Sequence, residues 1–327
     1  MTEQRSRVWV SQPLFDDVIA RLHEHFEVAS TGSVTEHSQA QIANALAAAD
    51  GALVTLNERI GRSEIAGAPA LRAIANVGVG YNNLDITALS AFGIVATNTP
   101  DVLTETTADF GFALLLATAR RITEGERWLR EGRWQQWSFQ TLLGADLHGS
   151  TLGILGMGRI GQGIARRASG FNMKVLYHNR SRLPAAAERE TRAVHAGFHQ
   201  LLAQSDHLVL ALPYAQESHH IINAQALARM KPTATLVNIA RGGIVDEDAL
   251  VDALANGRLA AAGLDVFEGE PAVNPRLLGL RNVVLTPHIA SASPATRRAM
   301  VALAVENLIA ALGHGPRAGA PPNPISA

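Results

Sequence analysis

The amino-acid sequence predicts an α/β protein with two domains, each built on a doubly wound parallel sheet. Its length of 327 residues exceeds what one hydrophobic core usually supports. Short apolar runs also alternate with helical patterns in two separate series, and this βα repetition is typical of a parallel sheet covered by helices on both faces. With 47% hydrophobic and 17% charged residues, both domains can be well packed.

The first series begins with the apolar run RVWVS, the helical pattern LFDDVIARLHEHF and the run EVAS. The helical pattern has apolar residues at positions 14, 15, 18, 19, 22 and 26, as expected of a helix with one buried face. The alternation continues through AQIANALAAA, GALVTL, RSEIAGA, LRAIANVG, DITALSAFG and IVATN.

A longer helical stretch follows Pro100 and begins near Thr104. It contains the most apolar run of the chain, residues 108–119, which is too short to cross a bilayer and is predicted to be a buried helix. The polar, tryptophan-bearing segment 131–149 separates it from the second series. That series runs from TLGILGMGRIGQGIARRAS through KVLYHN, HLVLALP, ATLVNIA, AAGLDV and NVVLTPH to a last helical segment, PATRRAMVALAVENLIAALG.

Composition excludes several classes of partner. A formal net charge of -1, with scattered lysine and arginine, provides no basic face for nucleic acid. The absence of cysteine excludes disulfides, thiol chemistry and thiolate metal sites, and is compatible with a reducing cytosol. The amino-terminal sequence MTEQRSRVWVS lacks the apolar core of a secretory signal. A cytoplasmic location away from the membrane is therefore expected.

A glycine-rich loop opens the second series. Gly156, Gly158 and Gly161 form GMGRIG, which fits the GxGxxG pattern, with Arg159 and Ile160 between the last two glycines. The loop follows the apolar strand TLGIL and opens a helix, so a pyrophosphate could sit on the helix amides. This context predicts a Rossmann-like domain that binds a dinucleotide, in preference to a purely structural turn.

The acidic residue expected about 20 positions after such a loop is missing. The corresponding turn reads Asn179, Arg180, Ser181. A carboxylate would repel a ribose 2'-phosphate, whereas a guanidinium can pair with it. The turn therefore predicts NADP(H) as the preferred cofactor, with NAD(H) as a weaker alternative. The alternative interpretation is that the turn is merely basic and solvated, and Arg182 in particular fits this alternative.

Three later segments place reactive side chains just after apolar strands. Arg241 follows one strand in NIARGGIVDE, Glu270 follows another in GLDVFEGEP, and His288 follows a third in VVLTPHIAS. Ligands bind beyond the carboxyl ends of the strands in doubly wound sheets. We therefore expect all three side chains where a substrate would meet the nicotinamide.

These blocks resemble the D-isomer-specific 2-hydroxyacid dehydrogenases across nearly the whole chain. NVGVGYNNLD, the GMGRIG loop, NIARGGIVDEDAL, AAGLDVFEGEP and TPHIAS match the diagnostic segments of that family in order. TPDVLTETTADF and the NRS turn are most similar to the branch of glyoxylate/hydroxypyruvate and 2-ketogluconate reductases. The resemblance implies a substrate-binding domain of residues 1–99 and 290–327, to which the C-terminal helix returns, an NADP-binding domain of residues 100–289, and hinges near 99 and 289.

The resemblance also implies catalytic roles. His288 would donate a proton to the substrate carbonyl oxygen as hydride arrives at the carbon. Glu270 would bond to His288 and favour its charged form. Arg241 would hold the 2-oxo acid and polarise its carbonyl group. In the first domain, the turn with Gly78, Val79 and Gly80 would bind the substrate carboxylate through its amides, and Leu56 would border the substrate tail.

Cofactor contacts are implied at many further positions. Thr107 and Pro213 match residues that touch the nicotinamide and adenosine sides, and Asp265 matches a residue near the nicotinamide carboxamide. The complete predicted set is Val79, Thr107, Gly156, Gly158, Arg159, Ile160, Gly161, Asn179, Arg180, Ser181, Leu212, Pro213, Ile239, Ala240, Arg241, Asp265, His288 and Ala290. No catalytic metal is expected, since His219 and His220, two of 12 histidines, lack further ligand spacing and are predicted to be solvated.

Trp134 and Trp137 would lie on one face if their segment were helical. Because the family dimerises through this region, we expect both tryptophans at or near a homodimer interface, with one approaching the partner's active site. Ordinary core packing is the alternative.

The sequence thus predicts an NADPH-dependent reductase of small 2-oxo acids, such as glyoxylate, hydroxypyruvate or 2-ketogluconate, which yields D-2-hydroxy acids. One alternative is an NAD-linked D-2-hydroxyacid dehydrogenase, such as a D-lactate or phosphoglycerate enzyme, which the missing ribose acid disfavours. Another is a nucleotide-sensing corepressor of the same fold, which turnover of 2-oxo acids would distinguish.

Overall fold

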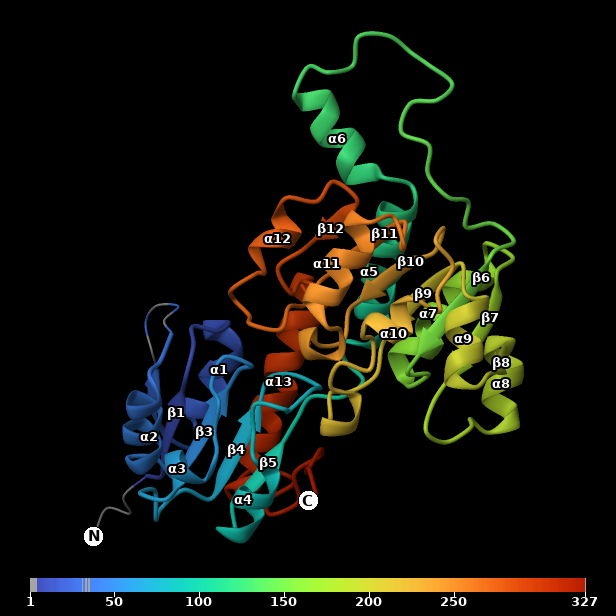
Figure 1. The fold of residues 1–327 in the computed structure, drawn as a ribbon. Coiled ribbons are helices and arrows are strands. Elements are labelled where there is room, and N and C mark those ends of the chain that lie inside the picture. Colours follow the sequence, from blue (N-terminus) through green and yellow to red (C-terminus); the bar gives the residue numbers. More distant parts are fainter. Residues whose placement is uncertain (1–4, 31, 33, 35, 327) are drawn as a thin grey trace. The chain divides into compact units, whose positions relative to one another are not determined.

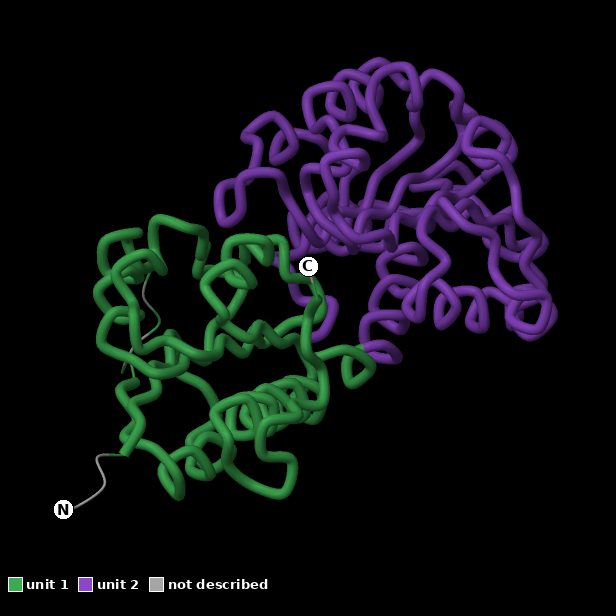
Figure 2. The backbone as a smooth tube through the Cα atoms, turned by 90° about the horizontal axis from the view of Figure 1, so that it is seen from below, with its two compact units in different colours: residues 1–103, 292–327 green, residues 104–291 purple. Residues whose placement is uncertain are grey.

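The computed structural model describes residues 5–30, 32, 34 and 36–326. The remaining positions belong to the predicted first domain and lie outside the described residues. The chain divides into two compact units, residues 1–103 with 292–327 and residues 104–291 (Figure 2). The sequence-based boundaries fall at positions 99/100 and 289/290, and the structural ones at 103/104 and 291/292.

The first unit contains a five-stranded parallel sheet of order β2-β1-β3-β4-β5. Its strands are β1 (Arg7–Val10), β2 (Glu27–Ser30), β3 (Gly51–Val54), β4 (Ala73–Asn76) and β5 (Val95–Thr97). Its helices are α1 (Asp16–His23), α2 (Gln39–Ala47), α3 (Arg62–Ile65), α4 (Ile86–Ala91) and α13 (Pro294–Ala311).

The C-terminal helix α13 completes the first unit. It packs on β3, β4, β5 and α1 (Figure 1). The approach to β3 is close, because a Cβ atom at Gly51 would lie 2.8 Å from a methyl group of Leu312, just beyond the helix. Ser293 caps the helix by accepting a hydrogen bond from the amide of Thr296, and Pro294 occupies its first turn.

The second unit contains a seven-stranded parallel sheet of order β12-β11-β10-β9-β6-β7-β8. Its strands are β6 (Thr151–Leu155), β7 (Lys174–His178), β8 (Ala193–His195), β9 (His207–Leu210), β10 (Thr235–Asn238), β11 (Ala261–Leu264) and β12 (Val283–Leu285). Its α-helices are α5 (Thr104–Ala119), α6 (Ile122–Arg130), α7 (Arg159–Ser169), α8 (Ala185–Thr191), α9 (Phe198–Gln204), α10 (Ala224–Leu227), α11 (Glu247–Ala255) and α12 (Pro275–Leu278). Two short 3₁₀ turns are η1 (Gln216–Ser218) and η2 (Gly242–Ile244).

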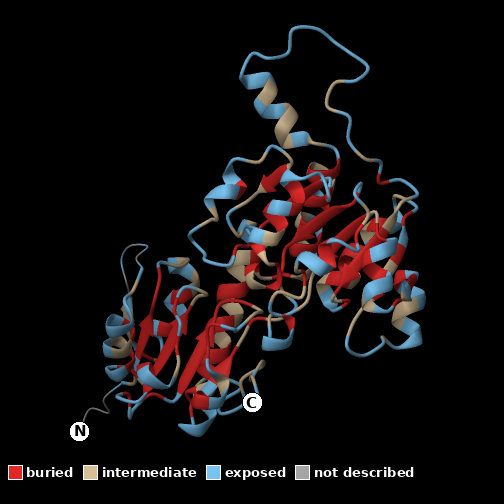
Figure 3. Cartoon of the chain, in the orientation of Figure 1, coloured by how far each residue is buried: buried red, intermediate tan, exposed pale blue. Residues whose placement is uncertain are grey.

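Helices cover both faces of this second sheet. One apolar core lies under α9, α10 and α11, and the other lies under α5 and α7. The central strands β9, β10 and β11 are therefore buried along their whole length (Figure 3). The apolar run 108–119 forms a largely buried helix, as predicted, and Gly111 lets it approach Ile239. In the described structure, no helix is both long and apolar enough to cross a membrane.

The segment that carries Trp134 and Trp137 is not helical, which corrects the conditional expectation of a shared helical face. Helix α6 ends at Arg130, and Gly132 follows with a positive φ of 67°, which interrupts helical geometry. The next regular element is β6. The alternative prediction, that both tryptophans pack in the core, is also wrong for this single chain, because Trp134 and Trp137 are 54% and 67% exposed.

Candidate active site

The glycine loop joins β6 to α7 and has the form that a dinucleotide requires. Gly156 has a φ of 98°, and a Cβ atom there would lie 2.4 Å from the amide nitrogen of Leu212. A Cβ atom at Gly161 would lie 2.4 Å from the carbonyl oxygen of Gly156. At Gly158 it would meet no atom within 4 Å, so the chain's own packing does not require that glycine. Open space before a helix N-terminus fits the approach of a pyrophosphate.

Two further features fit a cofactor beside this loop. The buried hydroxyl of Thr107 has no hydrogen-bond partner among the residues that the structure describes. Buried hydroxyl groups normally have one, so this group suits a ligand atom. The other predicted contact residues lie at strand ends: Leu212 and Pro213 after β9, and Ile239 and Ala240 after β10.

Asn179, directly after β7, is bonded to the glycine loop. Its Oδ1 atom accepts a hydrogen bond of 2.6 Å from the backbone amide of Met157. The side chain therefore fixes the loop without adding a negative charge. The sequence showed only that the usual acid was missing, and this bond was not predicted.

Arg180 and Arg182 have different environments. Arg182 forms two bonds to Glu188, of 2.8 and 2.9 Å, and Tyr177 donates a third of 2.6 Å. The hydrogen bonds from Arg182 and Tyr177 lower the pKa of Glu188 to about 2. Arg180 is exposed, and no described carboxylate pairs with it. The turn is thus anchored by Arg182, while the guanidinium of Arg180 stays available to a ligand.

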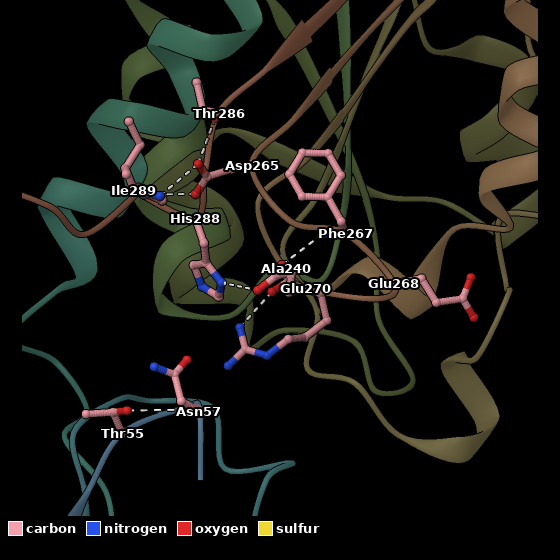
Figure 4. A network of polar contacts seen from close by, with 12 residues as sticks. Thr55, Asn57, Ala240, Asp265, Phe267, Glu268, Glu270, Thr286, His288 and Ile289 are labelled. Atoms are coloured by element: carbon pink, nitrogen blue, oxygen red, sulfur yellow. Dashed lines mark hydrogen bonds and ion pairs between the residues drawn. The ribbon is translucent and has the colours of Figure 1, made fainter. Parts of the chain in front are cut away.

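His288 and Glu270 face each other beyond the strand ends of β12 and β11 (Figure 4). His288 Nδ1 lies 2.8 Å from one oxygen of Glu270, and the other oxygen accepts a bond from the amide of Phe267. Burial alone would raise the pKa of Glu270. This pKa nevertheless lies below its ordinary value, because several interactions together outweigh burial: the hydrogen bond and charge of His288, the hydrogen bond from the Phe267 amide and the charge of Arg241.

Asp265 holds the turn that carries His288. Its carboxylate is fully buried and accepts bonds from the Thr286 hydroxyl and from the amides of Ile289 and Ala290, of 2.7, 2.9 and 2.8 Å. The carbonyl oxygen of Asp265 accepts a bond from the His288 amide. This turn places His288 at a φ of 52°, which non-glycine residues seldom adopt. Burial raises the pKa of Asp265, although these bonds oppose the effect.

Arg241 follows β10 and lies in a tightly packed loop. Asn238 braces the loop, donating to the carbonyl oxygen of Arg241 and accepting from the amide of Ala240. A Cβ atom at Gly242 would lie about 2 Å from the backbone of Phe267, so the arginine loop packs directly on the turn that carries Glu270. Burial lowers the pKa of Arg241, and the charge of Glu270 opposes that shift. Sequence reasoning missed Asn238, although a polar residue at the end of an apolar strand was a visible signal.

The predicted anion nest lies after β4 in the first unit. The carbonyl oxygens of Gly78, Val79 and Gly80 all accept hydrogen bonds, from Thr99, Asn98 and Asn76 respectively. Within the described part of the chain, the amides of Val79 and Gly80 donate none. A turn with occupied carbonyl groups and free amides suits an anion.

Leu56 borders the same turn. A Cβ atom at Gly78 would lie 3.3 Å from a methyl group of Leu56. Leu56 lies in the loop that Glu58 organises, since this buried carboxylate accepts bonds from Ser11, Gln12 and Thr55. The sequence analysis identified Leu56 and did not identify Glu58.

The two neighbouring histidines differ from the sequence-based expectation. His219 is exposed, but His220 is half-buried and its Nε2 lies 2.9 Å from Glu268 Oε1. The prediction of a solvated side chain agrees with His219 and is wrong for His220. His220 and Glu268 are 48 positions apart in the sequence. Tertiary packing brings them together, and no local sequence pattern predicts this contact.

Fold and site together define the class of the protein. A glycine loop opens a helix at the carboxyl edge of a parallel sheet, and Arg241, Glu270 and His288 follow strands of the same sheet. This combination is typical of Rossmann-type proteins that bind dinucleotides.

Comparisons with known proteins specify the family. A family model described as the D-isomer specific 2-hydroxyacid dehydrogenase, NAD binding domain, matches residues 112–290. A glyoxylate reductase of Pyrococcus horikoshii is 46% identical over 310 residues, which cover 94% of this chain and 92% of that protein. Glyoxylate/hydroxypyruvate reductase B of Yersinia pestis is 47% identical over 298 residues, covering 90% and 91%.

A solved structure agrees with these relatives. The NADPH-dependent glyoxylate/hydroxypyruvate reductase of Sinorhizobium meliloti, in complex with NADP and malonate, superposes with a TM-score of 0.87 at 37% identity, covering 98% of this chain and 97% of that one. The chain belongs to the D-isomer specific 2-hydroxyacid dehydrogenase family, which confirms the resemblance seen in the sequence.

Proposed function

We propose that this protein reduces small 2-oxo acids to D-2-hydroxy acids with NADPH as the reductant. The observation that carries the proposal is the bonded pair of His288 and Glu270, beside a half-buried Arg241 whose loop packs on the same turn. A general acid, a group that orients it and a guanidinium suit the reduction of a carbonyl group next to a carboxylate.

Each side chain has a role in this proposal. Arg241 binds the carboxylate and carbonyl oxygens of the substrate, and burial strengthens its electrostatic effect. Glu270 engages His288 through Nδ1, which leaves Nε2 to give a proton to the carbonyl oxygen. The bound nicotinamide supplies the hydride. The amides of Val79 and Gly80 bind a carboxylate, and Leu56 contacts the substrate tail.

The preference for NADPH is supported by the turn after β7. Asn179 bonds the glycine loop without a negative charge, and Arg180 is exposed and free of any described acid. The reductase of known structure from Sinorhizobium meliloti was solved with NADP. For the substrate, the names of the relatives favour glyoxylate and hydroxypyruvate, and we retain 2-ketogluconate as a further candidate.

We also propose a homodimer formed through the segment 122–146. Helix α6 has no buried residue, and an apolar surface is exposed along this segment at Ile122, Leu129, Trp134, Trp137, Phe139 and Leu143. Apolar exposure of this extent usually marks an interface. A cytoplasmic location stays a prediction.

The test of the cofactor preference compares steady-state rates with NADPH and NADH for the natural chain and for Arg180→Ala. A charge-assisted bond to a phosphate contributes about 1.5–3 kcal/mol, so KM for NADPH should rise about tenfold to a hundredfold while KM for NADH is unchanged. Arg189→Ala, which removes another exposed arginine nearby, is the matched control and should change neither. An equal effect of Arg180→Ala on both cofactors would contradict the preference.

A further inference from the structure

His219, His220 and Glu268 form a cluster on the surface of the second unit. One ring nitrogen from each histidine and one carboxylate oxygen all lie within 4.8 Å of one another. The two rings are stacked, with centroids 3.9 Å apart and planes inclined by 21°. Two imidazoles and a carboxylate are a donor set that divalent transition cations bind.

The backbone beneath the cluster is fixed. His220 has a φ of 48°, in a region that non-glycine residues seldom occupy. Its amide donates a hydrogen bond of 2.9 Å to the carbonyl oxygen of Gly243. The amide of Glu268 donates one of 2.7 Å to the buried carboxylate of Glu247. An unfavourable conformation that its surroundings hold in place is characteristic of a binding site.

The nitrogen atoms are arranged to serve as ligands. Nδ1 of His219 lies 3.1 Å from the hydroxyl of Tyr214, which leaves Nε2 of that ring for a cation. Metal-bound histidines usually donate their other N–H to such a neighbour. Nε2 of His220 lies 2.9 Å from Glu268 Oε1, and ligands of one tetrahedral zinc ion lie about 3.3 Å apart.

We propose that His219, His220 and Glu268 bind a divalent transition cation of the Zn²⁺ type. The site is separate from the pair of His288 and Glu270, because the Glu268 carboxylate is directed away from that pair (Figure 4). A cation held there ties the segment after β9 to the segment between β11 and α12 that also carries Glu270. This inference does not depend on the proposed substrate or cofactor.

The test is calorimetric titration of the untagged natural chain with Zn²⁺ at neutral pH, with Mg²⁺ as a comparison. We expect one Zn²⁺ site and no Mg²⁺ binding to it, because magnesium prefers oxygen ligands. His219→Ala and Glu268→Gln should each weaken Zn²⁺ binding at least about tenfold. His199→Ala, which removes another exposed histidine, is the control and should bind as the natural chain does.

Thermal unfolding supplies a second readout and shows whether the variants fold. Without metal, all four proteins should unfold at similar temperatures. Zn²⁺ should raise Tm for the natural chain and for His199→Ala, and raise it less for the two ligand variants. Absence of Zn²⁺ binding, or equal affinity in all four proteins, would overturn the proposal.

Discussion

His288 Nδ1 lies 2.8 Å from Glu270 Oε2, although the two residues follow different strands. The other oxygen of Glu270 is held by the amide of Phe267, so the carboxylate is fixed at both ends. The imidazole is thereby oriented, and its Nε2 atom is not engaged by Glu270. In the proposed mechanism, His288 moves the proton and Glu270 orients it, and this geometry assigns the two tasks to separate groups.

The charge of Glu270 should make stability depend on pH. Its pKa is lower in the folded chain than its ordinary value of 4.5, so the folded state binds fewer protons there than the unfolded state. The resulting stabilisation is present above about pH 5 and is lost as pH falls through the folded pKa. Since the side chain is 33% exposed, solvent screening limits the size of this stabilisation.

Urea unfolding of the natural chain and of Glu270→Gln between about pH 3 and pH 6 measures this effect. The difference in unfolding free energy should grow in favour of the natural chain as pH rises and then level off. A difference that does not change with pH would contradict the account.

The turn that carries His288 should depend on Asp265. In Asp265→Asn an amide nitrogen replaces one of two oxygens that accept bonds from the Thr286 hydroxyl and the amides of Ile289 and Ala290. At least one buried donor then loses its acceptor, which costs about 1–3 kcal/mol. Urea unfolding should show that loss, together with a reduced kcat because His288 is misplaced. Natural stability in the variant would mean that the turn does not need this carboxylate.

Two glycines of the same loop should respond differently to alanine. Gly156→Ala introduces a Cβ atom 2.4 Å from the Leu212 nitrogen at a positive φ, so we expect a loss of at least about 2 kcal/mol of stability. Gly158→Ala meets no protein atom and should leave stability within about 1 kcal/mol. It should instead weaken NADPH binding, measured by fluorescence titration. A stable Gly158→Ala that binds NADPH normally would argue against phosphate contact at this glycine.

The acceptor role of Asn179 makes Asn179→Asp informative. The carboxylate can keep the bond to the Met157 amide, so the loop should stay in place. Its charge should repel a 2'-phosphate and lower kcat/KM for NADPH about tenfold or more relative to NADH. Steady-state rates with both cofactors provide the ratio. An unchanged ratio would place the 2'-phosphate elsewhere.

Local patterns in the sequence predicted much of this structure. The alternating series marked both parallel sheets, and the glycine spacing marked the loop between β6 and α7. Positions just after apolar strands identified Arg241, Glu270 and His288, because parallel strands end at one edge of a sheet. These features depend on periodicity and on residues close together in the chain.

Features set by long-range packing were not predictable in this way. Three of these features join residues that are distant in the sequence: the hydrogen bond from Met157 to Asn179, the contact between His220 and Glu268, and the bond from Ser11 to the buried Glu58. Trp134 and Trp137 have helical spacing, but in the described structure they stay 54% and 67% exposed. Their segment therefore gains little from buried tertiary contacts, which usually stabilise a short helix.

The most direct test of the proposed function is to incubate the purified chain with NADPH and hydroxypyruvate, following NADPH oxidation and the chirality of the product together. The account predicts one D-glycerate formed for each NADPH oxidised, with a rate that falls about a hundredfold or more in His288→Asn. Binding of NADPH without oxidation by hydroxypyruvate, glyoxylate or 2-ketogluconate, or formation of L-glycerate, would contradict it.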